Sequence, residues 1–409
     1  ASDLLGGVAR EVVEFYGEKT MQHPVGSGPF RLGAWRRSSE IVLERNPNYR
    51  ERRYEDEAEP APDDAEGQAL LARFKGRRLP MVDEVRVSIV PEAQPFWLAF
   101  LNGQVDILGT SAGSLPSEFV TQAMPNGKLA PNLAKRGIRA ARQVNSDTGF
   151  IMFNMEDPVV GGYTPDKVAL RRAIALAYDN DEELRALRNG QGIPAQSTIP
   201  PFTSGYESGY RSEMSAHDPA RAMALLDLYG YLDRDGDGWR ELPDGSPLLL
   251  RLSSTSSQIS RRGNELWRKH LARVGLRIEF DVATWPDLLK RSRNATLMMW
   301  GYGWVAQSPD GGFFLGIAYG PNSGESNDAR FALPAFDRLF ERQSVLPDGT
   351  ERLALMREGK NMLAAHMPYK AHVHTITNDL LQPRVRGWWR HPFARDTWVY
   401  TGVDMETSS

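Results

Sequence analysis

Hydrophobic and polar positions follow two periods along the chain, and these predict most of its strands and helices. Apolar residues that alternate with polar ones, or short apolar runs, predict strands at 30–34, 41–44, 85–90, 105–108, 148–154, 276–285 and 368–381. Apolar residues at helical spacing predict helices at 94–102, 165–178, 218–228, 258–274, 286–293, 334–343 and 351–366. Strands alternate with helices, so we expect an α/β fold, with parallel pairing of the strands that flank the helix at 94–102.

The chain is organised around the stretch LMMWGYGWVAQSPDGGFFL at 297–315, where an apolar run changes into a loop rich in Gly and Pro. At strand spacing Trp300 and Trp304 project to the same side. A row of this kind is more often core than binding site. However, Gln307 and Asp310 follow at once, and small-molecule pockets combine aromatic walls with a few polar groups. We therefore expect this loop to line a solute pocket.

Composition narrows the function classes. The 409 residues are 41% hydrophobic and 25% charged, as in an ordinary folded protein, and the length predicts two or three domains. The net charge of −3 provides no overall positive field, so nucleic acid is a poor candidate partner. The absence of cysteine excludes disulfides, thiolate metal sites and a Cys nucleophile. No apolar run reaches the length of about 18 residues that a membrane span needs.

The motif DRDGDGWRELPD requires a test for metal binding. Its residues Asp233, Asp235, Asp237 and Gly238 match the first half of a calcium loop, with Asp244 at the twelfth position. That position calls for the longer Glu, and a strand-like run follows where an exiting helix is required. A hairpin turn built from Asp and Gly accounts for the motif better, and we predict no metal there.

Other catalytic and metal signatures give little support for an enzyme. The chain has no nucleophile elbow, HExxH motif, phosphate loop or dinucleotide fingerprint in the correct context. His372 and His374 stand two apart on a predicted strand, but only the distant His366 could complete a metal site, so ordinary surface or core histidines are the expectation. Carboxylate pairs of the glycosidase kind stay open, and a hydrolase is the least favoured reading.

Several segments together resemble one protein family. They are PVGSGPFRLGAW with IVLERNPNY, LPMVDEVRVSIVPEAQPFWLAFLNGQVDI at 79–107, FIMFNMEDP with KVALRRAIALAYDNDEEL at 150–184, the helix and Asp-Gly turn at 218–252, and WVAQSPDGGFFL. In this order they resemble the bacterial family 5 extracellular solute-binding proteins, the peptide-, nickel- and opine-binding receptors of ABC importers. The resemblance covers most of residues 20–400.

The resemblance implies an α/β, two-lobed architecture of the periplasmic-binding-protein type II, with mixed sheets and an incomplete first lobe. Residues 1–145 are expected to form part of lobe I together with a C-terminal return at 375–409, and 146–374 to form lobe II. In the family the hairpin near 24–44 lies well inside the chain, so we expect an N-terminal part to be missing here. The charged, Pro-containing stretch 50–78 is expected to be an exposed loop longer than the family usually carries.

For function, the resemblance implies a receptor that captures a peptide or peptide-like solute between two lobes and delivers it to membrane permease subunits. Such a protein is expected to be a monomer without a cofactor, exported to the periplasm or the cell surface. Residues 1–17 read as an amphipathic helix and lack the features of a signal peptide. The alternative is a sensor or regulatory module of the same fold.

The resemblance also suggests the solute contacts. Peptide-binding members resemble the pattern W-G-A-D-Y-P-D-P-D-N-F-L, whose first Asp pairs with the amino terminus of the peptide. This pattern places Trp304 on its Trp and Gln307 on that Asp, which removes a charge. A neutral amide is a weaker partner for an ammonium group, so a blocked, modified or non-peptide solute rivals a free peptide. The predicted solute contacts are Trp300, Trp304, Gln307, Asp310 and Asn154.

Overall fold

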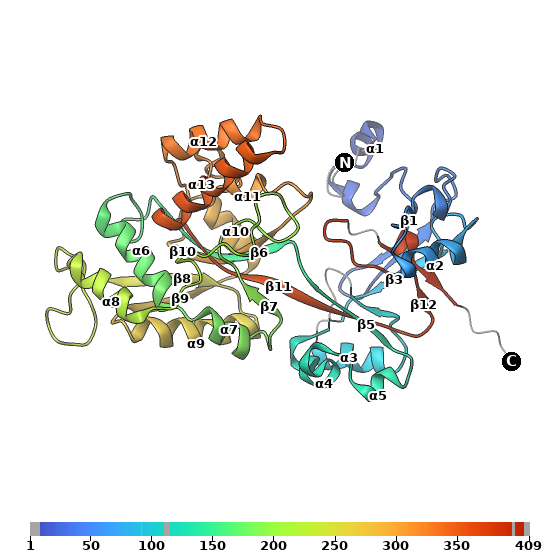
Figure 1. The fold of residues 1–409 in the computed structure, drawn as a ribbon, viewed down its shortest axis with the longest axis horizontal. Coiled ribbons are helices and arrows are strands. Elements are labelled where there is room, and N and C mark those ends of the chain that lie inside the picture. The colour runs from blue at the N-terminus through green and yellow to red at the C-terminus, as the bar shows by residue number, and fades with distance from the viewer. Residues whose placement is uncertain (1–8, 91, 110–114, 395–396, 405–409) are drawn as a thin grey trace. The chain divides into compact units, whose positions relative to one another are not determined.

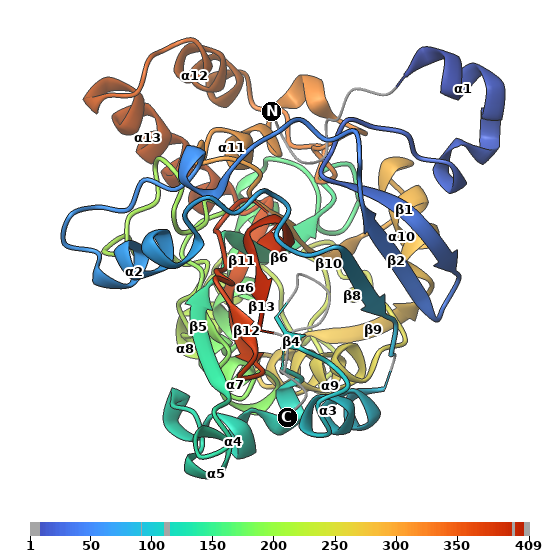
Figure 2. The same ribbon diagram turned by 90° about the vertical axis from the view of Figure 1, so that its right-hand side faces the viewer.

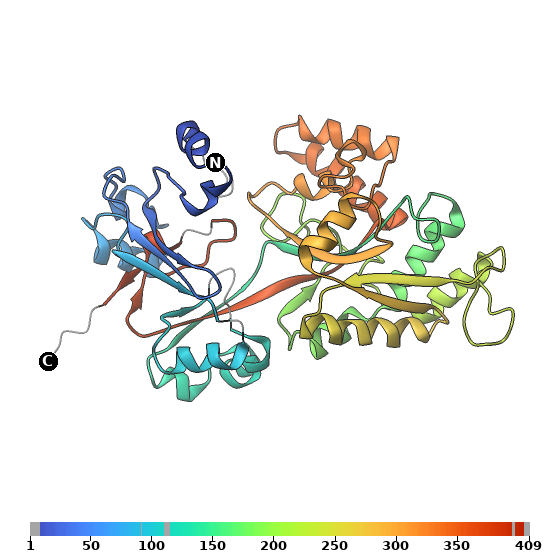
Figure 3. The same ribbon diagram turned by 180° about the vertical axis from the view of Figure 1, so that it is seen from behind.

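A computed structural model describes residues 9–90, 92–109, 115–394 and 397–404. The chain divides into two compact units, which are treated separately below. Unit 1 consists of Ala1–Gln143 and Thr377–Ser409, and unit 2 of Val144–Ile376. Their elements can be followed by colour and label in Figures 1 and 2, and by colour from behind in Figure 3.

Unit 1 contains a three-stranded antiparallel sheet. Its strands are β1 (Phe30–Arg36), β2 (Glu40–Arg45) and β3 (Glu84–Ser88), in that order. β1 and β2 form the hairpin that the alternation predicts, with Trp35 opposite Ile41. Between β2 and β3 the expectation of a plain exposed loop is wrong. A helix, α2 (Ala65–Phe74), occupies this stretch, and Phe74 and Tyr54 are buried together with Val399 from the tail.

A second part of unit 1 is helical, with α3 (Ala93–Leu101), α4 (Val120–Ala123) and α5 (Pro131–Ala134) around a core that includes Trp97 and Phe100. Strand β4 (Ile107–Leu108) pairs antiparallel with Leu380 and Leu381 at the end of β11 (Tyr369–Leu381). The predicted parallel pairing around α3 is therefore wrong, because β3 joins β2 and β4 joins β11 instead.

The remaining elements of unit 1 are short. In the described part of the tail after β11, the short strands β12 and β13 pair with each other. The elements are α1 (Arg10–Tyr16), β5 (Arg139–Val144), β12 (Val385–Arg386) and β13 (Gly402–Val403).

Unit 2 is built on a mixed sheet in which β11, β6, β10, β8 and β9 lie side by side in this order (Figure 1). β10 and β11 run antiparallel to β6, whereas β8 runs parallel to both β9 and β10. The sheet thus contains the parallel pairing that an α/β fold requires. Its further strands are β6 (Asp147–Phe153), β7 (Gly192–Pro194), β8 (Leu249–Ser254), β9 (Arg277–Val282) and β10 (Met299–Val305).

Six of the helices described in unit 2 (α6, α8, α9, α10, α12 and α13) agree with the apolar periodicity, and some of the helices begin at polar caps. Asp218 accepts the N–H of Arg221 at the start of α8, and Ser257 accepts the N–H of Ser260 at the start of α9. None of the helices in the described ranges is long and apolar enough to cross a bilayer. They are α6 (Pro165–Ala177), α7 (Asn180–Ala186), α8 (Pro219–Leu228), α9 (Gln258–Ala272), α10 (Trp285–Arg293), α11 (Phe313–Gly316), α12 (Pro334–Ser344) and α13 (Thr350–His366).

Candidate functional site

The candidate site begins on β10, which lies inside the sheet between β6 and β8. Trp300 pairs with Met152 on one side and Ser253 on the other, whereas Trp304 pairs only with Thr148 of β6. The first half of β10 is therefore covered by two neighbours, and its second half leads into the loop before α11. This rigid strand fixes where the loop starts.

Trp300 is a core residue in this structure, with only 1% of its surface exposed. Its ring stacks on Tyr302 at 4.5 Å and lies 5.1 Å from Trp285 at the start of α10. Trp285 is itself 49% exposed. A solute on this side would meet Trp285 before Trp300, so Trp300 can act on a solute only through the ring that covers it.

Trp304 is half-buried and lies edge-on against Phe313, with the ring centroids 5.3 Å apart. Its indole Nε1 is buried and makes no hydrogen bond within the described part of the chain. A buried indole N–H usually has an acceptor. Trp304 therefore presents part of an apolar ring at the end of β10, and its buried N–H is a donor that no described residue satisfies.

Asp310 joins the loop to a distant helix. Its carboxylate accepts the N–H of Gly312 at 2.8 Å and hydrogen bonds from Arg352 of α13 at 2.8 and 2.9 Å. Burial raises the pKa of Asp310, but the Gly312 N–H and the Arg352 guanidinium outweigh it and hold the pKa below its ordinary value. Asp310 is consequently charged at neutral pH and shapes the loop, with about half of its side chain still exposed.

A second segment of unit 2 supports the same loop. The N–H of Ser204 donates to the carbonyl of Pro309, and its hydroxyl accepts the N–H of Gly311. A Cβ on Gly311 would lie 2.1 Å from the Ser204 carbonyl oxygen, so only glycine fits this contact. The loop is thus held by both Ser204 and Arg352.

The two remaining predicted contacts differ in their surroundings. Gln307 is exposed on the loop. Asn154 is 3% exposed, donates from Nδ2 to the Ala295 carbonyl at 2.9 Å and accepts the N–H of Glu156 at 3.0 Å. Both polar atoms of Asn154 are therefore used inside the fold, and a solute would have to displace one of these bonds.

The structure also shows residues near the loop that sequence reasoning missed. Phe313, Phe202 and Val305 are large apolar side chains with 44%, 50% and 39% of their surface exposed. Phe202 has a φ of 66°, a conformation that a bulky residue rarely adopts. The pair Gly311-Gly312 signals the turn before Phe313, but no sequence pattern points to Phe202 or to Arg352 on α13.

The two histidines on β11 are not brought together for a metal. A bulge separates Ala371 from Val373, and the Nδ1 of His372 lies 2.9 Å from Glu183. The Nδ1 of His374 lies 2.7 Å from the carbonyl oxygen of Asp147. Neither histidine belongs to a group of three metal-ligating residues in the described ranges.

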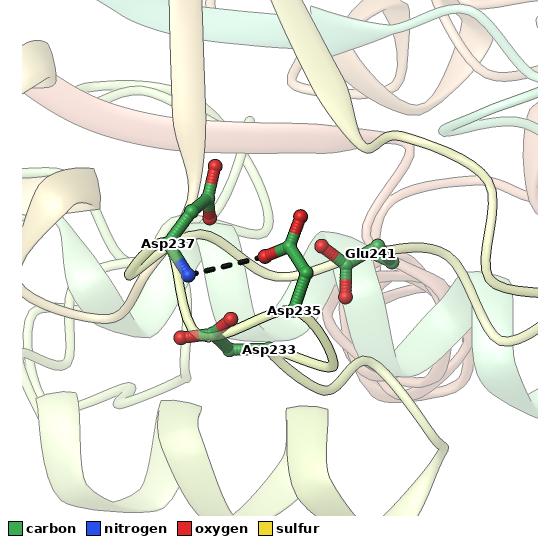
Figure 4. Close-up of side chains that lie close together, drawn as sticks. All are labelled: Asp233, Asp235, Asp237 and Glu241. Carbon is green, nitrogen blue, oxygen red and sulfur yellow. Dashed lines mark hydrogen bonds between the residues drawn. The ribbon is translucent and has the colours of Figure 1, made fainter.

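The acidic loop after α8 gathers four carboxylates whose oxygens lie within 4.8 Å of one another, from Asp233, Asp235, Asp237 and Glu241 (Figure 4). Glu241 stands in this group where the calcium pattern would use Asp244, which instead accepts hydrogen bonds from Ser246.

The expected hairpin forms only as an isolated bridge between Glu241 and Pro247. The carboxylate oxygens of this loop already accept backbone N–H groups: Asp233 accepts those of Gly236 and Gly238, and Asp235 accepts that of Asp237. The absence of a metal site therefore stays a prediction.

Comparison with known proteins places these features in a family. Residues 3–326 match the bacterial extracellular solute-binding proteins, family 5 middle region. Heme-binding protein A of Haemophilus influenzae is 25% identical over 383 residues, which are 93% of this chain and 60% of that protein. Di/tripeptide-binding protein 2 of Pseudomonas aeruginosa is 25% identical over 386 residues, or 93% of this chain and 62% of that protein.

Solved structures share the fold. The periplasmic binding protein DppA of Helicobacter pylori, solved with the peptide STSA, has a TM-score of 0.75 at 18% identity. The matched region is 99% of this chain and 69% of the DppA chain. The oligopeptide-binding protein AppA of Bacillus subtilis, solved with a nonapeptide, has a TM-score of 0.74 at 15% identity. The matched region is 97% of this chain and 72% of the AppA chain. The chain spans about three fifths of the length of the two sequence relatives.

Proposed function

Because the chain belongs to the bacterial extracellular solute-binding proteins of family 5, we propose that it is the solute-capturing part of an ABC importer's receptor. In this role it binds a peptide or peptide-like solute and passes it to the permease subunits in the membrane. Export to the periplasm or the cell surface follows from that role. The match over residues 3–326 is the observation that carries this proposal.

The loop between β10 and α11 provides the solute contacts of unit 2 in this proposal. Trp304 supplies an apolar ring and an N–H group without a partner in the described part of the chain. Gln307 is exposed beside it, and Asp310 keeps the loop in shape through Arg352. Apolar walls with a few polar groups are typical of small-molecule sites.

The nature of Gln307 bears on the solute. The amide can accept a hydrogen bond from an ammonium group but cannot offer the charge-assisted bond that a carboxylate forms, which is about twice as strong. A solute whose amino group is blocked, modified or absent therefore suits this loop better than a free peptide. The proposal requires no reaction, and the relatives are named for binding.

The direct test is native mass spectrometry of the full-length protein, purified from its own organism, to detect a retained small molecule. A peptide-like mass that is lost on mild denaturation supports the proposal. Calorimetry with amino-blocked and free peptides then measures the preference. A protein that carries no small molecule and gives no heat with either class of peptide would rule out peptide capture and leave the sensor module as the better reading.

A further inference from the structure

Unit 2 holds a pocket of about 270 Å³ away from the loop that follows β10. It lies where β7 pairs with β11, and Ile193 and Pro194 of β7 form one wall. Tyr206 and Arg211 come from the loop after β7, and His374 comes from β11. None of the five predicted solute contacts lines it. The pocket is therefore a feature separate from the proposed solute loop.

His374 lines the pocket and keeps one ring nitrogen as a hydrogen-bond acceptor. The residue is 2% exposed, and its Nδ1 lies 2.7 Å from the Asp147 carbonyl, which can only accept a hydrogen bond. The proton is thus on Nδ1, and burial lowers the pKa of His374 to about 4, so the ring is neutral at pH 7. Nε2 has a free lone pair, and the residues that the structure describes give it no partner.

Arg211 supplies the matching donors. Its Nη1 donates to the carbonyls of Ser208 and Tyr210, at 2.9 and 2.8 Å, and these two bonds orient the guanidinium. In the described ranges its Nε and Nη2 donate to no other group. Arg211 is exposed, and its remaining N–H groups are suited to a carboxylate, which a guanidinium can bind through two parallel bonds.

The charge around the pocket favours an anion. Glu207 accepts hydrogen bonds from Lys360 at 2.6 Å and from Arg357 at 3.2 Å, so its negative charge is already matched. A second, wider pocket of about 700 Å³ adjoins the first and shares Arg211 and Glu207 with it. Arg211 lines both pockets, Arg357 lines the wider one, and the buried Lys360 lies behind Glu207, which is the one carboxylate among the lining residues. These three cations exceed that one negative charge, and the excess positive charge attracts anions.

From these observations we propose that the pocket binds a small carboxylic acid that carries a hydroxyl group. The carboxylate lies on Arg211, and the hydroxyl group donates to Nε2 of His374. The ring of Tyr206 and the side chains of Ile193 and Pro194 contact the carbon chain. A volume of about 270 Å³ lies just below the usual range of small-molecule pockets and suits a small ligand. The proposal stands whether or not the protein carries peptides.

The test is calorimetry or ligand-observed NMR with lactate, 3-hydroxybutyrate and 4-hydroxybutyrate, which place the hydroxyl group at three distances from the carboxylate. Propionate and butyrate lack the hydroxyl group, the methyl ester of the best hydroxy acid lacks the charge, and inorganic phosphate tests for a general anion site. We expect at least one hydroxy acid to bind roughly three- to tenfold more tightly than its deoxy counterpart, as for one neutral hydrogen bond. Absence of hydroxy-acid binding, or equally tight binding of the deoxy acid or of phosphate, would overturn the proposal.

Two variants locate the site. Arg211→Gln should weaken the binding of the hydroxy acid at least tenfold while leaving that of its methyl ester unchanged. His374→Phe should abolish the difference between the hydroxy acid and its deoxy counterpart. Arg338→Gln, at an exposed position on α12, is the matched control and should change neither. If His374→Phe does not fold, Arg211→Gln and the comparison of ligands decide alone. Failure of peptide binding would leave this test unaffected.

Discussion

Arg352 donates from Nη2 to both carboxylate oxygens of Asp310, at 2.8 and 2.9 Å, although the two residues lie 42 positions apart. Arg352 is 8% exposed in its side chain and also donates to the Gln343 carbonyl and to Asp348. The ion pair ties the loop after β10 to α13, so the shape of the proposed solute loop depends on a helix that does not touch the solute in our proposal.

The first prediction concerns this ion pair. Arg352→Met should lower the free energy of unfolding by about 1 to 3 kcal/mol, because the Gln343 carbonyl and Asp310 lose a buried donor. Arg342→Met is the control, since Arg342 is 63% exposed and its pair with Glu351 is exposed too. The control should change the value by less than about 0.5 kcal/mol. Urea unfolding measures both, and equal effects would show that Arg352 has no special part in the fold.

The second prediction separates the two tryptophans of β10. Trp300→Ala should cost about 3 to 5 kcal/mol of stability, because it empties a fully buried site. Trp304→Ala should leave the fold intact and weaken solute binding by about 1 to 3 kcal/mol, or roughly five- to 150-fold. Thermal unfolding and calorimetry of the full-length protein give the two numbers. A Trp304→Ala protein that binds the retained solute with undiminished affinity would remove Trp304 from the site.

The third prediction tests Gln307. Gln307→Asp should favour peptides with a free amino group, because a carboxylate forms a charge-assisted bond with an ammonium group. Calorimetry with free and amino-blocked versions of the same peptides measures the change, and Gln307→Glu is a control for the reach of the side chain. If the Asp variant gains nothing for free amines over blocked ones, Gln307 does not face an amine.

The fourth prediction concerns calcium. We expect no rise in melting temperature when calcium is added, because backbone N–H groups already satisfy carboxylates of the acidic loop. Asp235→Ala is the diagnostic variant, since Asp235 belongs to the group of four carboxylates. A calcium-dependent rise in the parent protein that disappears in Asp235→Ala would show that the loop binds the ion.

The fifth prediction is a dependence of stability on pH. The hydrogen bond from Arg357 and, against an opposing effect of burial, that from Lys360 lower the pKa of Glu207 from 4.5 to about 2. As the pH falls, Glu207 is therefore protonated at a higher pH in the unfolded chain than in the folded protein. The stabilisation is complete above pH 4.5 and is lost between pH 4.5 and 2.

Glu207→Gln should flatten the loss of unfolding free energy in that range, as measured by urea unfolding at several pH values. The exposed Glu325 provides the control, and Glu325→Gln should leave the slope unchanged. If both variants keep the full slope, the pair of Glu207 with Arg357 and Lys360 does not stabilise the protein.

The local pattern of apolar and polar residues was sufficient to predict the long strands and helices. The strand-like run at 368–381 predicts β11, and the spacing of apolar residues predicts α9 and α13. The helix α2 was missed because charged residues and prolines precede it, and only Tyr54 and Phe74 show that this region contributes to a core. The pairing partners of β3 and β4 could not be predicted, because pairing depends on segments far away in the chain.

The candidate site was harder to predict than the fold. Alternation placed Trp300 and Trp304 on one side of a strand, but it could not distinguish a buried ring from a half-exposed one. That difference arises from β8 and from Trp285, which cover only the first half of β10. The sequence predicted Asp310 as a polar contact of the solute. Its ion pair with Arg352 could not be predicted, because the two residues lie 42 positions apart in the chain.

Strand β11 has a consequence for the order in which the protein is made. Its residues up to Ile376 complete unit 2, whereas Leu380 and Leu381 pair with β4 of unit 1. These last strand residues are synthesised long after β4, so β4 lacks this pairing partner while the whole of unit 2 is synthesised. Unit 2 can close first, and the earlier-made unit 1 is completed last. The strand pairing of β4 in unit 1 is therefore completed only after all of unit 2 has been synthesised.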